Sequence, residues 1–537
     1  MSGNTLLSNL NSPDTRPSLE FQDSFEYYRP EAPTGERSML FELLPRICFL
    51  PRNLARRYHR GRYYSPLIPN LRLSRHFGRF RLRILYYIFI LLLIVLLLVL
   101  ASSVFCPSYT TLPSHYESLR NAVTESDLPG RGNPYGEKIF IAAALYDPTG
   151  DLAQGHWGSN ILHLIHLLGE DNVFLSIYEN DSGDAGKTAL QALDQQVKCN
   201  SSIVYEDHLD LLQLPHVTTP SGDERVKRIV YLAEARNRAV RPLDKPAVKF
   251  DRLLFLNDVV FDPLDALQLL FSTNQDPEND HKPRYRAACA VDFINPFKFY
   301  DTYATRDLEG YSMGLPFFPW FSDSGSGHSR KSVLAGNDAV PVRSCWGGMV
   351  AFDAQFFQLD QTAAHRVEIA DPRGLPARFR ALQDVDLFWD ASECCLIHAD
   401  IQAPRPDHHD DATKFPETGI YINPFVRVAY DTRTLSWLWT TRRFEKLFSI
   451  IHNIGNHLVG LPWFNPRREE VPGQRVQDTI YVSGVDDSKA GSIRPVERIT
   501  RHDGFCGRKG LQVIVPREVG EKGWKTIPMP VRDVNLL

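Results

Sequence analysis

The chain has 537 residues, of which 43% are hydrophobic and 23% are charged, and its formal net charge is −4. This composition indicates a protein with a folded core, and the small negative charge does not indicate binding to nucleic acid. Residues 1–83 begin with a stretch rich in Ser, Pro and Asn and continue with an arginine-rich stretch. We expect them to form a disordered, basic cytosolic tail.

An uninterrupted apolar run covers residues 84–105 and reads ILYYIFILLLIVLLLVLASSVF, without a charged residue or a proline. At about 1.5 Å per residue, a helix of this length crosses a hydrocarbon core of about 30 Å. The run lies too far from the N-terminus, and is too long, for a cleaved signal peptide. We therefore predict one transmembrane helix.

The residues that flank this run predict its orientation. Between Pro51 and Tyr87 the sequence contains ten arginines and no acidic residue. Positive charge stays on the cytosolic side of a membrane, so the larger C-terminal part is expected in the lumen, as in single-pass type II proteins of the Golgi. The arginines could also contact an acidic partner or anionic lipid head groups, which agrees with the same topology. Residues 106–136, rich in Pro, Ser, Gly and Thr, are expected to form a lumenal stem.

The cysteines allow disulfides but do not determine their pairing. Cys106 directly follows the predicted anchor, and a bridge between two copies through it would make a dimer at the stem. Six further cysteines of the predicted lumenal part could form up to three bridges: Cys199, Cys289, Cys345, Cys394, Cys395 and Cys506. No spacing typical of structural zinc is present.

Predicted strands and helices alternate along residues 137–430. We expect strands at 138–145, 173–178, 202–205 and 252–256, and helices at 160–168, 185–197 and 225–240. This alternation predicts an α/β domain with a Rossmann-like, mostly parallel sheet. Residues 431–537 are expected to form a partly helical C-terminal extension.

Polar residues follow the predicted strands, where open parallel sheets bind their ligands. They are Asp147, Glu179, Asp207 and the pair Asn257-Asp258. Neither a dinucleotide fingerprint nor a P-loop accompanies them. A carboxylate directly after a strand is suited to hold Mg²⁺ or Mn²⁺ against a diphosphate, and Asp258 is placed for this role. Alternatively, the pair caps a turn or the following helix.

Residues 138 to about 400 resemble the fungal capsule-associated α-1,3-mannosyltransferases, glycosyltransferase family 69. The blocks that carry the resemblance keep their order and separation: Ile139-Phe140-Ile141-Ala142-Ala143, Leu175-Ser176-Ile177-Tyr178-Glu179-Asn180, Leu232-Ala233-Glu234-Ala235-Arg236-Asn237, Phe255-Leu256-Asn257-Asp258-Val259, Cys345-Trp346-Gly347-Gly348-Met349 and Ser392-Glu393-Cys394-Cys395-Leu396-Ile397-His398-Ala399-Asp400. The resemblance implies a GT-A-type fold, GDP-mannose as donor, a mannoside glycan as acceptor, and transfer with retention. Because Asn257-Asp258 departs from the Asp-x-Asp pattern of GT-A enzymes, the resemblance implies only Asp258 as a firm metal ligand.

Further residues are candidates for binding the nucleotide sugar. Arg236 and Asn237 precede the strand that ends in Asn257-Asp258, and a guanidinium there could pair with a phosphate or only with a protein carboxylate. Glu179 is placed to bind the base or ribose, or is a solvated loop acid. Asp147 follows the first strand and is assigned to the same donor site.

Trp346, Gly347 and Gly348 form a candidate sugar pocket, because glycines allow close backbone approach and an indole offers a flat apolar face. A core Trp beside a tight turn is the alternative. The irregular polar segment 301–340 before it is long enough for a lid over the substrate.

Glu393 and His398 flank an apolar run, Cys394 to Ile397, which we expect to be a buried strand. His398 could be a further metal or diphosphate ligand, or simply hydrogen-bonded. Glu393 and Asp386, with Asp384 as a further candidate, are the acids that could orient the acceptor or stabilise the transition state. A non-catalytic scaffold of the same fold and a glycosidase with two facing carboxylates remain the alternative functions.

Overall fold

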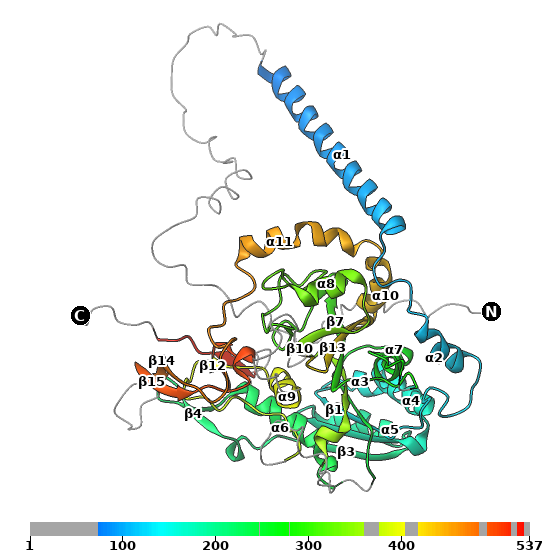
Figure 1. The fold of residues 1–537 in the computed structure, drawn as a ribbon, viewed down its shortest axis with the longest axis vertical. Coiled ribbons are helices and arrows are strands. Elements are labelled where there is room, and N and C mark those ends of the chain that lie inside the picture. The colour runs from blue at the N-terminus through cyan, green and yellow to red at the C-terminus, as the bar shows by residue number, and fades with distance from the viewer. Residues whose placement is uncertain are drawn as a thin grey trace, which may run out of the picture. The chain divides into compact units, whose positions relative to one another are not determined.

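The computed structural model describes residues 73–245, 248–278, 280–358, 375–402, 417–482, 491–516 and 523–530 (Figure 1). Most of the predicted cytosolic tail lies outside these residues. The first described element is helix α1 (Leu73–Phe105). Its part from Leu82 to Phe105 contains an 18-residue stretch with a mean hydropathy of 3.3, and by length and composition it is able to cross a membrane.

The body of the protein is built on one large sheet of mostly parallel strands. Its first half consists of β1 (Ile139–Leu145), β2 (Val173–Asn180), β3 (Asn200–Glu206) and β6 (Arg252–Leu256), in the order β3-β2-β1-β6 and all parallel. The four predicted strands are therefore confirmed, with small changes at their ends. The expected mixed α/β fold with a largely parallel central sheet is confirmed with them.

The second half of the sheet adds antiparallel pairs. Strand β11 (Met349–Asp353) lies antiparallel between β6 and β7 (Ala287–Asn295), and β13 (Ile420–Ala429) runs parallel to β7. Strands β10 (Val340–Ser344) and β9 (Arg306–Asp307) complete this edge. Short β8 (Lys298–Phe299) pairs with β7 beside this path.

Apolar residues on both faces of the strands explain why helices cover both sides of the sheet. Along β1, Ile139 and Ile141 belong to one buried cluster, and Phe140 and Ala142 belong to the other. Side chains of successive strand residues point to opposite faces, so a continuous apolar strand needs cover on each. The first cluster includes residues of α4 (His156–Leu168), α5 (Gly183–Asp194) and α7 (Pro263–Phe271), and the second includes residues of α6 (Arg228–Val240) and α9 (Glu393–Ile401).

Residues 106–136, expected as a stem, are folded against the body in this structure. Helix α2 (His115–Thr124) lies within them, and the side chains of Tyr109 and Tyr116 are buried. The ring of Tyr109 packs 4.8 Å from that of Phe425, and the Tyr116 hydroxyl accepts a hydrogen bond of 2.6 Å from Asn423 Nδ2. The prediction from composition overlooked these two buried tyrosines, because Pro, Ser and Gly dominate the segment around them.

Two elements differ from their predicted form. The run from Cys394 to Ile397, expected as a strand, lies in helix α9, because the hydroxyl of Ser392 caps it by accepting from the Cys394 N–H at 3.2 Å. Short apolar runs do not distinguish a buried helix from a strand. The segment 301–340 contains β9 and helix α8 (His328–Ala335). The C-terminal extension, expected to be partly helical, begins with two helices, α10 (Thr432–Thr441) and α11 (Phe448–Val459).

The C-terminal extension folds onto the sheet domain. Strand β16 (Arg508–Lys509) pairs with β12 (Trp389–Asp390), while β14 (Arg475–Val482) and β15 (Ser492–Ile499) form a hairpin. A further pair of the extension joins β17 (Gln512–Ile514) to β18 (Trp524–Thr526). A two-stranded sheet outside the extension joins β4 (His216–Thr218) to β5 (Glu224–Val226), just before α6. The disulfide Cys395–Cys506 links α9 to this extension, and Cys289–Cys345 links β7 to the end of β10.

The turn between β10 and β11 depends on glycine. Gly347 has a φ of +62°, and a Cβ placed on it would lie 1.9 Å from the carbonyl oxygen of Ala290 in β7. Gly348 also has a positive φ, of +67°, and a Cβ there would meet Val259. Both glycines therefore serve the close packing of the turn against neighbouring chain.

We expect Gly347→Ala to lower the free energy of unfolding by about 3 kcal/mol or more, because it adds a backbone clash to an unfavourable φ. Gly336→Ala is the matched control: Gly336 has a φ of +83°, but a Cβ there meets nothing within 4 Å. The control should lose only about 1 kcal/mol. Denaturant unfolding of both variants measures the difference, and equal losses would contradict the packing role of Gly347.

Candidate active site

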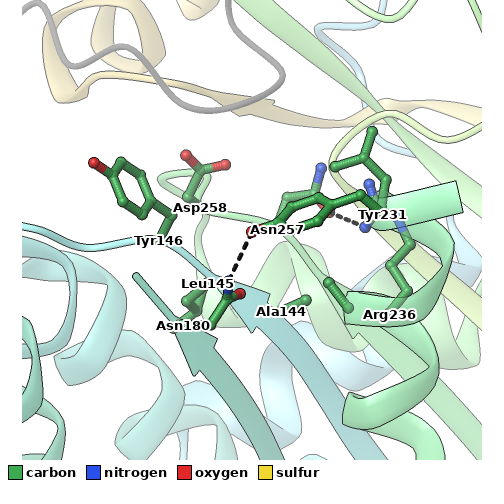
Figure 2. A pocket seen from close by; sticks show the side chains of 10 residues that line it. Ala144, Leu145, Tyr146, Asn180, Tyr231, Arg236, Asn257 and Asp258 are labelled. Atoms are coloured by element: carbon green, nitrogen blue, oxygen red, sulfur yellow. Dashed lines mark hydrogen bonds between the residues drawn. The ribbon is translucent and has the colours of Figure 1, made fainter. Parts of the chain in front are cut away.

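A pocket lies at the carboxyl ends of β1, β2 and β6, beside helix α6 (Figure 2). From β1 the chain continues through β2 and β3 on one side, and β6 then joins the other side of β1. Open α/β sheets bind ligands at such a reversal of strand order, because the loops there diverge and leave a crevice. We name it the donor pocket after the donor site that the sequence predicts at these strand ends, and it is lined by Ala144, Leu145, Tyr146, Asn180, Tyr231, Leu232, Ala235, Arg236, Asn257 and Asp258.

Asp258 supplies the carboxylate of the donor pocket. It comes two residues after the end of β6 and is partly exposed, whereas its neighbour Asn257 is buried. Figure 2 shows the side chains of Asp258 and Tyr146 beyond the strand ends, on the same side of the sheet edge. The Asn180 amide lies nearby and donates to the Tyr231 hydroxyl at 2.7 Å. The pocket therefore combines one acid with amide and phenol groups.

The surroundings of Asp258 fit a divalent cation whose remaining ligands are supplied by the substrate. Within the described residues, one group of three close potential ligands occurs, Cys289, Cys345 and His398, and its two cysteines form a disulfide. Asp258 is not part of such a group. A single carboxylate suits Mg²⁺ or Mn²⁺ whose other ligands are diphosphate oxygens and water, because these ions are commonly bound by one or two carboxylates together with phosphates.

A buried polar cluster supports the floor of the donor pocket. Arg236 Nε donates to Glu393 Oε1 at 3.0 Å, and Arg236 Nη1 donates to Asn257 Oδ1 at 3.1 Å. The indole N–H of Trp346 donates to the same Asn257 oxygen at 3.2 Å. The guanidinium also lies 4.6 Å from the centre of the Trp346 ring, a cation–π distance. Four predicted site residues, here called the Arg236 cluster, are thus brought together.

A second pocket lies on the other side of this cluster. Glu393 and Trp346 line it, and Leu232 lines both pockets. Its other carboxylates are Asp292 and Asp301, and its remaining lining residues are Arg228, Ile229, Tyr300, Tyr303, Ser392, Cys394 and Tyr430. We name it the acceptor pocket after the acceptor or sugar pocket that the sequence predicts at Trp346.

Sequence reasoning missed several lining residues. Tyr146 directly follows Leu145, the last residue of β1, and Asn180 directly follows Glu179 at the end of β2. The reasoning that selected polar residues at strand ends, among them Glu179, could therefore have included both. Asp292 is a lone acid inside the apolar strand β7, and it is fully buried. A charge in such a strand is itself a signal, since burying a carboxylate without a functional or paired role is costly.

Other predicted site residues have structural partners away from the two pockets. Asp147 accepts hydrogen bonds from the backbone N–H groups of Leu152 and Ala153 at 2.9 and 3.0 Å, at the start of the short helix α3 (Asp151–Gln154). Asn237 bonds both to the carbonyl oxygen and to the N–H of Phe379, at 2.8 and 2.9 Å. Neither side chain lines the donor pocket.

The candidate acids before α9 are also engaged elsewhere. Asp386 is fully buried and pairs with Lys509 Nζ at 2.5 Å, and its Oδ1 accepts from the Phe388 N–H. Asp384 pairs with Arg467 at 2.6 Å. These pairs join the sheet domain to the C-terminal extension, and neither acid lines a pocket described above.

His398 is fully buried beside the Cys289–Cys345 disulfide, not beside Asp258. Its Nδ1 lies 2.7 Å from the carbonyl oxygen of Cys394, and its ring packs 5.4 Å from that of Phe352. Burial lowers the pKa of His398 to about 4, so the ring is neutral at physiological pH. Its surroundings are those of a core histidine.

Glu179 is buried at the end of β2, with only 1% of its surface exposed, and it does not line the donor pocket. Its Oε1 has no hydrogen-bond partner among the described residues. Burial is the main cause that raises the pKa of Glu179 to about 7, and the nearby Asp147 carboxylate adds to it. The carboxyl group is therefore partly protonated near neutral pH.

Stability should depend on pH through Glu179. A carboxyl group with a raised folded pKa favours the folded state fully below its ordinary value of 4.5, and this contribution is lost as the pH rises through about 7. Glu179→Gln removes this loss, so the variant should gain up to about 3 kcal/mol relative to the parent protein above pH 7. Denaturant unfolding from about pH 5 to about pH 8, which covers the interval between the ordinary and the raised pKa, measures it. Exposed Glu224→Gln is the control, and parallel curves for the two variants would contradict the prediction.

The buried ion pair between Arg236 and Glu393 should contribute more to the free energy of unfolding than an exposed ion pair does. Arg236 and Glu393 side chains are 5% and 3% exposed, so Glu393→Gln leaves the guanidinium without its countercharge in a buried site. We expect a loss of about 3 kcal/mol in the free energy of unfolding. Glu497→Gln breaks an exposed ion pair, in which the side chain of Arg475 is 75% exposed and that of Glu497 is 50% exposed. This change should lower the free energy of unfolding by less than about 1 kcal/mol. Similar losses in thermal or denaturant unfolding would refute the role of burial.

The fold and the site together define an α/β domain with a pocket at the strand-order reversal, and one carboxylate, that of Asp258, lines this pocket. Residues 138–400 match the family model described as Cryptococcal mannosyltransferase 1. The segment contains Asp258 and the whole Arg236 cluster, and this domain of the chain belongs to that family. The protein is therefore a glycosyltransferase.

Two further comparisons add little. A search of curated proteins finds no significant match to the chain. Among solved structures, a mannosyltransferase from Pyrobaculum calidifontis in complex with GDP-Man and Mn²⁺ is similar over 65% of this chain and 71% of its own, at 12% identity and a TM-score of 0.30. A similarity of this size does not bear on the details of the site.

Proposed function

We propose that the protein is a membrane-anchored mannosyltransferase that moves mannose from GDP-mannose to a mannoside acceptor, with retention and in α-1,3 linkage. The observation that carries this proposal is the donor pocket with Asp258 at the strand-order reversal, inside the segment that matches the mannosyltransferase family. The donor, the linkage and the stereochemistry follow from the family resemblance, and the residues below are assigned from their positions.

In this proposal Asp258 holds the Mn²⁺ or Mg²⁺ that binds the diphosphate of the donor. The cation offsets the charge that develops on the departing GDP. Tyr146 and Asn180 line the same pocket and offer hydroxyl and amide groups to the nucleotide. Asn257 keeps its oxygen toward Arg236 and Trp346, so it positions the loop that carries Asp258.

The acceptor mannoside occupies the acceptor pocket, where the Trp346 indole offers an apolar wall. The Glu393 and Asp301 carboxylates line the pocket and accept hydrogen bonds from sugar hydroxyls, while Asp292 beside them is fully buried and already accepts from the Tyr430 hydroxyl at 3.1 Å. Arg236 orients the Glu393 carboxylate from the donor side. A hydroxyl of the acceptor thus meets the donor sugar where Leu232 borders both pockets, and no separate base is required if the leaving phosphate takes the proton.

The membrane part of the proposal places the catalytic domain in the Golgi lumen. Its support is the apolar helix from Leu82 to Phe105 and the arginines that precede it, which favour a cytosolic N-terminus. A non-catalytic scaffold of the same fold would keep this topology. It would differ in showing no turnover of a nucleotide sugar.

Asp258→Asn should lower mannose transfer by about 100-fold or more, because the amide is a poor ligand for a divalent cation. Detergent-solubilised full-length protein, incubated with labelled GDP-mannose, a mannobiose acceptor and Mn²⁺, provides the assay. A calorimetric titration with GDP should show that Mn²⁺ strengthens binding to the parent protein and not to the variant.

Asp262→Asn is the matched control for this experiment. Asp262 lies four residues further along and caps helix α7 by accepting from the Leu264 N–H at 2.9 Å, a role that asparagine performs equally well. The control should keep parental activity. Metal-independent transfer, or equal activity of both variants, would exclude the assigned role of Asp258, and absence of any turnover by the parent protein would favour the scaffold.

A further inference from the structure

Helix α11 has the reverse of the polarity expected for a helix on a water-soluble protein. Its exposed residues are apolar apart from His457: Ile450, Ile451, Ile454, Leu458 and Val459 expose between 58% and 81% of their surface. Its buried side is polar, since His452 and Asn456 are only 2% and 1% exposed. A helix that faces water buries its apolar stripe and exposes its polar residues, so this arrangement indicates an apolar environment outside α11.

The inverted orientation is held by specific hydrogen bonds. Arg330 of helix α8 donates to His452 Nδ1 at 2.9 Å, while His452 Nε2 lies 2.9 Å from the carbonyl oxygen of Leu315. Asn456 Oδ1 accepts from the Leu315 N–H at 2.7 Å, and Asn453 donates to Asp323 at 2.8 Å. Figure 1 shows α11 running over α8 at the margin of the body. Turning the apolar side of α11 inward would break all these hydrogen bonds, and the apolar side chains could not replace them.

The preceding helix, α10, continues the apolar surface. Trp437 and Trp439 are about half exposed, and the guanidinium of Arg443 lies 5.7 Å from the Trp439 ring. Arg433 and Arg443 are exposed beside them. Tryptophan and arginine together are typical of the head-group region of a bilayer, where the indole is half buried in lipid and the cation contacts phosphate.

The chain itself brings this surface close to the end of the membrane span. The span ends at Phe105, and three residues later the Ser108 N–H donates to the carbonyl oxygen of Arg442, the residue that ends α10, at 2.8 Å. Arg442 Nη1 donates in turn to the Tyr109 carbonyl oxygen at 3.0 Å. Three residues reach at most about 11 Å, so the end of α10 cannot lie far from the point where the chain leaves the bilayer.

We propose that the exposed side of α10 and α11, the membrane-facing surface, lies in the head-group region of the bilayer that the anchor helix enters. This inference rests on the membrane anchor of the proposed function and not on its catalytic part. The occupant is lipid: apolar residues of α11 enter the acyl boundary, and Trp437, Trp439 and the arginines remain at the head groups. The catalytic domain is then held against the membrane by two contacts, and not by its anchor alone.

The test uses the full-length chain in phosphatidylcholine vesicles with a doxyl-labelled phospholipid. In a background with Cys48→Ser, Cys106→Ser and Cys199→Ser, the variant Ile454→Cys is labelled with an NBD fluorophore. Its emission should shift to the blue and be quenched severalfold more than that of a label at Leu212→Cys. Leu212 is the control because it is 86% exposed and belongs to the short helix η2 (Leu211–Gln213), outside the membrane-facing surface.

A second change checks the chemistry of the contact. Ile451→Asp and Leu458→Asp, introduced together, should reduce the quenching at position 454 while leaving the thermal unfolding temperature unchanged, because both side chains are exposed. Flotation of the vesicles tests the anchor independently. A chain that floats but shows equal quenching at positions 454 and 212, or cross-links to a second copy through Ile454→Cys, overturns the membrane-facing surface alone. A chain that does not float overturns the anchor as well.

Discussion

The arrangement of both pockets depends on one buried guanidinium. Arg236 leaves helix α6 between the sheet and α9, where it reaches Glu393 on one side and Asn257 on the other, and it lies against the Trp346 ring. A buried charge is tolerated only when its countercharge and hydrogen bonds are in place, so these partners must all be present at once. The cluster therefore couples the loop that carries Asp258 to the wall of the acceptor pocket. The two pockets are positioned by a shared interaction.

The sheet topology explains why the donor pocket is open. Helices α4, α5 and α7 contribute to one of the two apolar clusters and helices α6 and α9 to the other, so polar groups gather where the strands end. The second half of the sheet, with β11 antiparallel to β6, brings the Trp346 turn next to that edge. The C-terminal extension completes the domain through Cys395–Cys506 and through the ion pairs of Asp384 and Asp386. These acids hold the architecture around the site rather than line it.

The polarity of α11 concerns the environment of the domain more than its chemistry. Because the polar side of α11 is hydrogen-bonded to Arg330, Leu315 and Asp323, its apolar side points outward and stays exposed among the residues that the structure describes. Lipid is the solvent that removes the cost of that exposure. If lipid of the bilayer covers this surface, as proposed, glycans close to the bilayer are the acceptors that the enzyme meets first.

The sequence by itself determined the apolar helix, the parallel strands β1, β2, β3 and β6, and the carboxylate at Asp258, because these depend on local runs and on strand ends. It also selected Arg236, Asn257, Trp346 and Glu393, although not their mutual contacts. The fold adds that Asp147, Asn237, Glu179, Asp386 and His398 line neither pocket, because the lining of a pocket depends on how segments far apart in the chain pack together. It likewise decided that Cys394 to Ile397 is helical and that α11 turns its apolar side outward, because packing and capping override a short apolar pattern.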